Sequence, residues 1–287
     1  MSVVRISTPE ARRIRPLLIS CGGGGKNIAS AFGDAEKLSV DVTEDAQLVI
    51  DAAVLSLSDM DDRFVKFADF HFVRELRRAL QGHDCLMIVA GLGGIAGGAA
   101  CVSVARIAAA LSIPSIASVA MPFNVEGAMR KGEARRALLR IEKTANITIS
   151  FDNNLVVEGT PNLTLSRALA IMNRIIVSPL EDISIASDLE WLGSLKGRHY
   201  RGSYSVEYII GSNWERKAVA GLLSKMHESA RNVKRIGLFV ECADGHSDNC
   251  MLLAEEFERL AVTEEITIFS WREGSESRNR VSAIALY

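Results

Sequence analysis

The chain has 287 residues, enough for one large domain or two domains of ordinary size. Apolar residues make up 48% and charged residues 24%, which is typical of a soluble globular protein and excludes a disordered, collagen-like or disulfide-dense chain. Because 33 Lys and Arg stand against 35 Asp and Glu, the net charge of −2 gives no overall basic field for nucleic acid.

Cysteine and histidine spacing argues against a disulfide framework and against a metal site. The five cysteines contain no Cys-x-x-Cys pair, and the five histidines contain no pair four residues apart. We therefore expect reduced thiols, a cytoplasmic protein and no metal site built from His and Cys. Residues 86–105 carry no charge, but five glycines within residues 91–98 would weaken a membrane helix. A strand, a glycine turn and a helix explain this stretch better, so we expect no membrane partner.

Strands and helices alternate over about the first 150 residues. Short apolar runs predict strands, and apolar residues at helical spacing predict helices. The predicted strands are residues 17–21, 38–42, 85–90, 115–121 and 147–151; the predicted helices are 28–32, 64–80, 99–111 and 126–143. This alternation predicts βαβ units and an α/β domain with a mainly parallel sheet, covered on both faces because its strands lack polar alternation.

The pattern changes after residue 160. A long helix is predicted over 163–177, with Pro179 marking a kink or stop. Strands follow at 206–210, 235–242, 266–271 and 281–286, with helices at 214–230 and 248–261. The last two strands look like a hairpin. We expect three parts: a nucleotide-binding domain over residues 1–160, a central connecting helix over 161–187, and a smaller α+β domain over 188–287.

Two glycine clusters carry the chemistry. Gly22 to Gly25 and the glycines of residues 91–98 each follow a predicted strand and precede a predicted helix. In an open α/β sheet, ligands bind at this edge, where glycine lets backbone N–H groups and a helix N-terminus approach an anion. Plain backbone packing is the alternative for each cluster. Neither cluster has the Gly-Lys-Ser/Thr ending of a P-loop or a well-fitting dinucleotide fingerprint.

Four motifs in order resemble the FtsZ/tubulin family of GTP-binding cytoskeletal proteins, and FtsZ more than tubulin. They are CGGGGKN at Cys21–Asn27, AGLGGIAGGAA at Ala90–Ala100, MPFNVEGAMR at Met121–Arg130 and ALAIMNR at Ala168–Arg174. The likeness covers nearly the whole chain, including RVSAIA near its end. It implies a Rossmann-like GTP-binding domain, a central helix and a second domain.

The resemblance also implies which residues contact GTP or GDP, with a magnesium ion as an optional companion. The phosphate contacts would come from both glycine clusters: Gly22, Gly23, Gly24, Gly25, Asn27, Gly91, Gly93, Gly94, Ala96, Gly97 and Gly98. Glu126 and Arg130 would contact the ribose, although their spacing also fits an exposed ion pair. Asn173 would contact the guanine edge, together with Asp152 or Asn153.

Several positions depart from the family pattern. Ala96 and Gly98 stand where the family's signature loop has threonines, and Leu169 stands where the family has an aromatic residue that stacks on the base. The family's glycine-alanine loop is missing between residues 55 and 67. The loop that places carboxylates in the next subunit's site corresponds to residues 187–193, where Asp188 and Glu190 are the candidate catalytic acids. The alternative, which the sequence favours slightly, is that both are ordinary loop acids.

The sequence therefore predicts an FtsZ-like guanine-nucleotide-binding protein with a cytoskeletal or cell-division role. It would associate head to tail with itself or another FtsZ-like subunit, with weak or absent GTP hydrolysis. A non-catalytic regulator that kept the fold is the alternative, and a Rossmann-type dehydrogenase a remote third. We expect no nucleic-acid partner and, since the chain ends at its last strand, no C-terminal tail for membrane adaptors.

Overall fold

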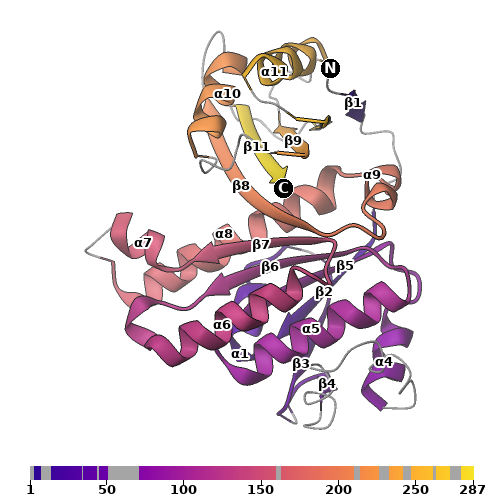
Figure 1. Ribbon diagram of the computed structural model, residues 1–287, viewed down its shortest axis with the longest axis vertical. Coiled ribbons are helices and arrows are strands. Elements are labelled where there is room, and N and C mark those ends of the chain that lie inside the picture. The colour runs from indigo at the N-terminus through magenta and orange to yellow at the C-terminus, as the bar shows by residue number, and fades with distance from the viewer. Residues whose placement is uncertain are drawn as a thin grey trace. The chain divides into compact units, whose positions relative to one another are not determined.

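The computed structural model describes residues 3–7, 14–33, 35–43, 45–50, 71–159, 163–209, 214–225, 233–241, 247–260, 263–271 and 279–287. The chain forms two compact units (Figure 1). The larger unit contains Ile14–Glu181 and Leu192–Tyr200. The smaller unit contains Met1–Arg13, Asp182–Trp191 and Arg201–Tyr287.

The sheet of the larger unit is entirely parallel, as predicted for an α/β fold. Its strands run in the order β7-β6-β5-β2-β3-β4. They are β2 (Pro16–Cys21), β3 (Glu36–Asp41), β4 (Leu48–Val49), β5 (Cys85–Gly91), β6 (Ser115–Met121) and β7 (Ile147–Asp152). In the β2–β5 register, Cys21 lies opposite Ala90. The two glycine clusters therefore begin side by side at the same edge of the sheet.

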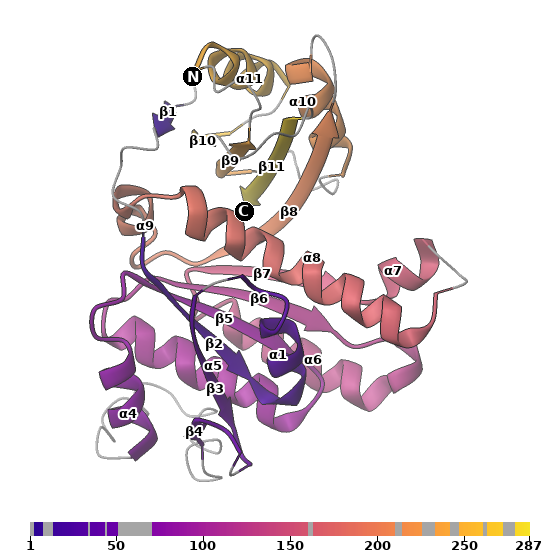
Figure 2. The same ribbon diagram turned by 180° about the vertical axis from the view of Figure 1, so that it is seen from behind.

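Helices cover both faces of this sheet (Figures 1 and 2). The helical elements are α1 (Gly22–Ala29), α4 (His71–Ala79), α5 (Ile95–Ala110), η1 (Asn124–Glu126), α6 (Ala128–Ile141), α7 (Asn154–Gly159) and α8 (Leu165–Ala186). The first 17 of the 22 residues of α8, through Glu181, belong to the larger unit. Helices α5 and α6 pack side by side on one face, and α1 and α8 lie on the other. Of the predicted helix 64–80, residues 64–70 lie outside the described residues.

Both glycine clusters are more helical than the sequence predicts. Helix α1 begins at Gly22 rather than at residue 28, and α5 begins at Ile95 rather than near residue 99. Glycine normally disfavours a helix, but here it permits backbones to touch. A Cβ added at Gly22 would lie 3.0 Å from the Cα of Gly97, and one at Gly24 would lie 3.2 Å from the Cα of Gly91. Close packing of α1, β5 and α5 thus offsets the low helix propensity.

Helix α8 also exceeds its prediction, since it continues through Pro179 to Ala186. A proline within a helix removes one backbone hydrogen bond and strains the preceding turn. Here the side chains of Ile176, Val177 and Leu180 are all buried. Their packing holds the segment helical on both sides of the proline.

The smaller unit contains a mixed sheet in the order β1-β10-β9-β11-β8. Its strands are β1 (Val3–Ser7), β8 (Tyr200–Ile209), β9 (Arg235–Glu241), β10 (Glu265–Trp271) and β11 (Asn279–Leu286), and its helices are α10 (Trp214–Lys225) and α11 (Ser247–Leu260). The short helix α9 (Leu189–Ser194) is divided between the two units after Trp191. The predicted hairpin of the last two strands is wrong. Strand β9 lies between them, because β9, α11 and β10 form a parallel crossover unit and β11 pairs antiparallel with β9 on its other side.

Candidate functional site

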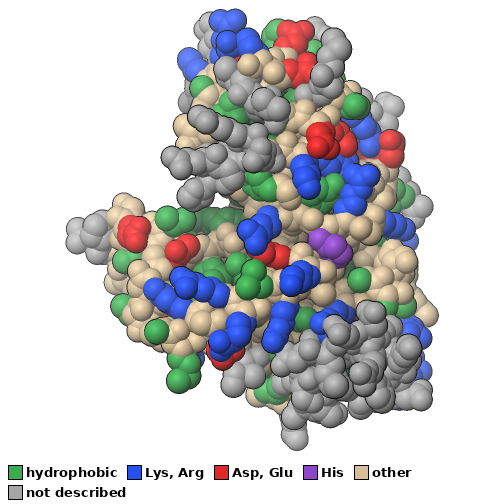
Figure 3. Space-filling view, viewed as in Figure 1, with side chains coloured by type: hydrophobic (Ala, Val, Ile, Leu, Met, Phe, Trp, Pro, Cys, Tyr) green, Lys and Arg blue, Asp and Glu red, His purple; other side chains and the backbone are tan. Residues whose placement is uncertain are grey.

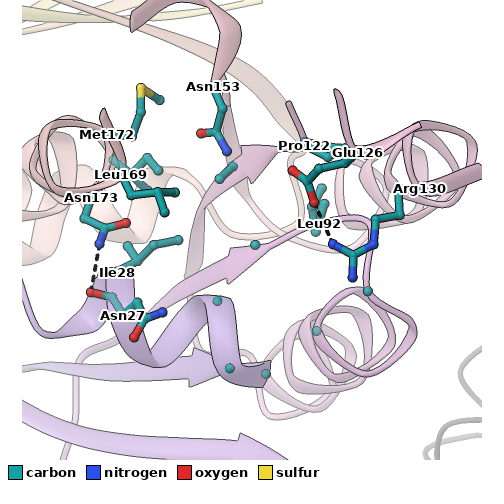
Figure 4. A pocket seen from close by; sticks show the side chains of 18 of the residues that line it. Asn27, Ile28, Leu92, Pro122, Glu126, Arg130, Asn153, Leu169, Met172 and Asn173 are labelled. Atoms are coloured by element: carbon teal, nitrogen blue, oxygen red, sulfur yellow. Dashed lines mark hydrogen bonds and ion pairs between the residues drawn. The ribbon is translucent and has the colours of Figure 1, made fainter. Parts of the chain in front are cut away.

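A pocket of about 660 Å³ opens where β2 and β5 end and α1 and α5 begin. All of its lining residues belong to the larger unit. Parallel strands bring their carboxyl ends to one edge of a sheet, and ligands of open α/β folds bind at that edge. The structure therefore places the two glycine clusters in one concave site (Figure 4).

Most of the predicted phosphate-binding residues line this pocket. They are Gly22, Gly23, Gly24, Asn27, Gly91, Gly94, Ala96 and Gly97. An added Cβ at Gly23 or Gly94 would meet nothing within 4 Å. Their backbones therefore face open space that a ligand can enter.

Three predicted glycines do not line the pocket and serve the fold instead. An added Cβ at Gly25 would lie 2.7 Å from the carbonyl oxygen of Val89, and one at Gly98 would lie 2.8 Å from the Cβ of Ala137. Gly93 adopts a positive φ of 106°, which favours glycine. Close packing and backbone conformation account for glycine at these positions, and their contacts with phosphate stay predictions.

Both helices that begin at the pocket lack a side-chain cap. Cys21 precedes α1 and its side chain accepts no hydrogen bond from the helix start, and Gly94, which precedes α5, has no side chain. The first N–H groups of a helix have no partner within the helix, and they carry its partial positive charge. Two such helix starts in one pocket suit an anion with several oxygens.

The ion pair of Glu126 and Arg130 borders the pocket. Arg130 Nη1 donates to Glu126 Oε2 at 2.6 Å, and the other carboxylate oxygen of Glu126 accepts the backbone N–H of Phe123 at 2.8 Å. The backbone contact fixes the carboxylate at the end of η1. The pair is thus held at the rim, and more than half of the Arg130 side chain is exposed.

The opposite side of the pocket combines two amides with apolar side chains (Figure 4). Asn173 Nδ2 donates to the carbonyl oxygen of Asn27 at 3.3 Å, which ties α8 to α1. Asn153 is 8% exposed, and its Oδ1 has no hydrogen-bond partner. Leu169 and Met172 of α8 lie between the two amides. A flat polar ring would find apolar contact and amide partners here.

Asn153, and not Asp152, lines the pocket. Asp152 Oδ1 accepts the backbone N–H of Asn154 at 2.9 Å, so its carboxylate supports the start of α7. Of the two residues that the sequence left open, the structure places Asn153 at the site.

The two candidate catalytic acids lie in the smaller unit. Asp188 is buried and accepts hydrogen bonds from Arg5, Ser7 and the N–H of Trp191 at 2.7, 2.6 and 2.8 Å. Burial alone would raise the pKa of Asp188, but these hydrogen bonds and the charge of Arg5 together hold it below the usual value. Glu190 is 78% exposed and pairs with Arg5 at 3.0 Å. Both residues remain predictions as catalytic groups.

Sequence reasoning missed several lining residues of α8, including Ser166, Ala170, Met172 and Ile176. Helical spacing from Asn173 identifies most of them, because residues three and four positions apart share a helix face. In the described part of the chain, no helix is long and apolar enough to span a membrane, and no group of His, Cys, Asp and Glu could hold a metal ion.

Comparisons with known proteins agree with this architecture. The sequence profile of the Tubulin/FtsZ family, GTPase domain, matches residues 68–159. Cell division protein FtsZ 1 of Thermococcus kodakarensis is 36% identical over 111 residues, which cover 39% of this chain and 30% of that protein. FtsZ 2 of Halobacterium salinarum is 26% identical over 189 residues, 59% of this chain and 47% of that protein. Over these segments the chain is similar to the tubulin/FtsZ family.

Solved structures extend the likeness in fold to almost the entire chain. An empty FtsZ dimer of M. jannaschii matches with a TM-score of 0.75 at 16% identity and covers 96% of this chain and 89% of its own. GDP-bound CetZ1 of Haloferax volcanii matches with a TM-score of 0.68 at 12% identity, over 95% of this chain and 94% of its own.

The chain aligns with only about a third to a half of the length of the curated FtsZ relatives that it matches. The matched family segment contains the second glycine cluster, Glu126, Arg130 and Asn153, but neither Gly22–Gly25 nor Asn173. The fold itself brings those two regions to the same pocket.

Proposed function

We propose that this protein binds a guanine nucleotide, GTP or GDP, in the pocket of the larger unit. The convergence of two uncapped helix starts, at Cys21–Gly22 and Gly94–Ile95, is the observation that carries the proposal. In domain terms, the site would be built from the nucleotide-binding domain over residues 1–160 and the central helix over 161–187, with residues 188–287 as a separate α+β domain.

The phosphates would lie at the glycine side of the pocket. Gly23 and Gly94 leave open space there, and the first amides of α1 and α5 supply donors without a positively charged side chain. Ala96 contributes no hydroxyl at this wall. A magnesium ion, if it accompanies the phosphates, would be held mainly by phosphate oxygens and water, since the described residues offer no cluster of acidic ligands.

The sugar and base would extend away from the glycine side. Glu126 offers a fixed carboxylate at the rim to ribose hydroxyls, next to Arg130. The base would lie against Leu169 and Met172, within reach of Asn173 and Asn153. An amide presents one donor group and one acceptor, which suits the mixed donor and acceptor edge of guanine. The unpartnered Oδ1 of Asn153 would accept an N–H of the base.

Isothermal titration with GTP, GDP and ATP tests this proposal. We expect binding of about micromolar strength for the guanine nucleotides and weaker binding of ATP. Gly94→Ala should weaken binding by about tenfold or more, since its methyl group would occupy the open space at the phosphate wall. Gly132→Ala is the matched control, because Gly132 also has open space around it but lies on α6 outside the pocket. Absence of binding at millimolar nucleotide would refute the proposal.

We further propose head-to-tail association with itself or with another FtsZ-like subunit, in a cytoskeletal or cell-division role in the cytoplasm. Among fold neighbours, CetZ2 of Haloferax volcanii was solved as a GTPγS-bound protofilament and TubZ of Bacillus thuringiensis as a two-stranded filament. A contact between unlike surfaces of identical subunits generates open filaments. Hydrolysis would be weak or absent, because Asp188 already accepts three hydrogen bonds within its own subunit.

A non-catalytic partner of an active family member is the second candidate, and the contacts of Asp188 favour it. Light scattering and phosphate release, measured together at rising protein concentration, distinguish a non-catalytic partner from a slow GTPase. Scattering with GTP but no phosphate release supports a non-hydrolysing filament protein or partner. Phosphate release that rises with concentration and falls in Glu190→Ala supports a slow GTPase and excludes the non-catalytic reading.

A further inference from the structure

Helix α6 presents an outer face that the nucleotide pocket does not explain. Its inner face packs against the larger unit through Ala134 and Ile141, which are fully buried. At 100° per residue, the opposite side of the helix carries Met129, Arg135, Arg136, Leu139 and Arg140, with Lys143 just beyond the helix end. We call this set the α6 outer face.

The α6 outer face is both basic and apolar. The face carries the four cationic side chains Arg135, Arg136, Arg140 and Lys143, while Glu133 pairs with Arg136 and Glu142 precedes Lys143. Among the cations, Met129 is 83% and Leu139 51% exposed. Figure 3 shows Lys and Arg side chains gathered over the face that α5 and α6 cover, with hydrophobic side chains between them. The patch is local, because the chain as a whole has a net charge of −2.

We propose that the α6 outer face docks on an anionic lipid membrane surface. A lipid interface takes up both components of this face, since headgroup phosphates attract Lys and Arg while apolar side chains enter the acyl boundary. Nucleic acid would pair with the cations, but it would leave Met129 and Leu139 without an apolar environment. Val125, 91% exposed in the neighbouring η1, adds apolar surface at the start of the helix.

Docking through this face would not require nucleotide. None of the outer-face side chains lines the pocket, and the ion pair of Arg130 with Glu126 lies at the pocket rim instead. The proposal differs from the sequence expectation of no membrane partner, which rested on the absence of a spanning helix. A peripheral face needs none.

Vesicle co-sedimentation of the full chain tests the proposal. The probes are vesicles of phosphatidylcholine mixed with phosphatidylglycerol, against vesicles of phosphatidylcholine alone. We expect binding to the anionic vesicles only, weakening as salt rises. The double variant Arg135→Gln/Lys143→Gln should bind about 25-fold more weakly, at about fivefold for each cation removed. Leu139→Ser should lower binding by about threefold to tenfold.

The matched control is Arg74→Gln/Arg77→Gln, which removes two exposed cations from α4 of the same unit. It should bind vesicles like the parent protein, and thermal melting should show that every variant is folded. The proposal is overturned if the parent does not sediment with anionic vesicles, if the α4 control loses as much binding as the α6 variant, or if Leu139→Ser binds like the parent. Binding of a labelled DNA duplex that depends on Arg135 and Lys143, without vesicle binding, would assign the face to nucleic acid instead.

Discussion

Gly25 of α1 lies so close to Val89 of β5 that a methyl group added at Gly25 would come within 2.7 Å of the Val89 carbonyl oxygen. Two positions earlier, Gly23 has nothing within 4 Å of the same added atom. One glycine run therefore serves two purposes: Gly25 lets a helix pack on a strand, and Gly23 leaves space in the pocket.

We predict that Gly25→Ala destabilises the protein by about 1–3 kcal/mol, because the new methyl group would push α1 away from β5. Urea denaturation measures the change. Gly23→Ala is the control: it should leave stability unchanged or raise it by up to about 1 kcal/mol, since Ala favours a helix over Gly. Equal stability of the two variants would show that α1 does not pack on β5 as described.

Asn153 and Asn146 are both almost fully buried, yet their amides differ in partners. Asn146 Oδ1 accepts the N–H of Ser115, and its Nδ2 donates to the carbonyl oxygens of Leu195 and Arg198. The Oδ1 of Asn153 has no partner. A satisfied buried amide stabilises the fold, whereas an unsatisfied acceptor does not.

We predict that Asn153→Ala changes the free energy of unfolding by less than about 1 kcal/mol but weakens guanine nucleotide binding by about tenfold or more. Asn146→Ala should do the reverse: a loss of about 2–3 kcal/mol in stability, with nucleotide affinity retained at temperatures where it is folded. Titration calorimetry and thermal melting on the two variants supply both readouts. Unchanged nucleotide affinity in Asn153→Ala would remove Asn153 from the site.

All strands of the larger unit except the two-residue β4 were predictable, because apolar runs bounded by glycine or polar residues mark them directly. Residues 115–121 were predicted with the bounds that the structure has, and residues 147–151 to within one residue. The order of the motifs likewise predicted that Gly22–Gly24, Gly94 and Asn173 share a site, and the structure places all of them in one pocket.

Other features depend on contacts between distant segments, which local patterns do not encode. The start of α1 at Gly22 depends on the glycines of β5 and α5 that lie against it. Strand β1 is short and half polar, and it forms because Val3–Ser7 pairs with β10 at the sheet edge. The separation of β10 from β11 depends on where β9 inserts.

Asp182 anchors a buried polar cluster in the smaller unit. Its carboxylate accepts Arg280 Nη1 at 2.7 Å and Nη2 at 3.0 Å, together with the hydroxyls of Tyr204 and Ser282 at 2.8 and 2.5 Å. We predict that Asp182→Ala destabilises the protein by about 3–5 kcal/mol, because Arg280 would keep its charge in a mostly buried position without its carboxylate. Tyr204→Phe removes two hydrogen bonds, the one that Tyr204 donates to Asp182 and the one that it accepts from Arg280, and should cost about 2 kcal/mol. Chemical denaturation ranks the two, and equal costs would contradict this account of the cluster.

Asp188 gives the stability of the protein a predictable dependence on acid. Its pKa is lower in the folded chain than the usual value of about 3.9: although burial opposes ionisation, the donors Ser7, Trp191 and Arg5 outweigh it. Because the pKa is lower in the folded state, the ionised carboxylate stabilises the fold at pH values above the usual pKa. This contribution is lost as the pH falls through the lowered pKa. We therefore predict that Asp188→Asn loses less stability than the parent between neutral pH and acid. Ser7→Ala, which removes one donor, should show an intermediate loss. Urea denaturation at a series of pH values measures the slopes, and parallel curves for parent and Asp188→Asn would show that the hydrogen bonds of Asp188 do not favour its ionised form.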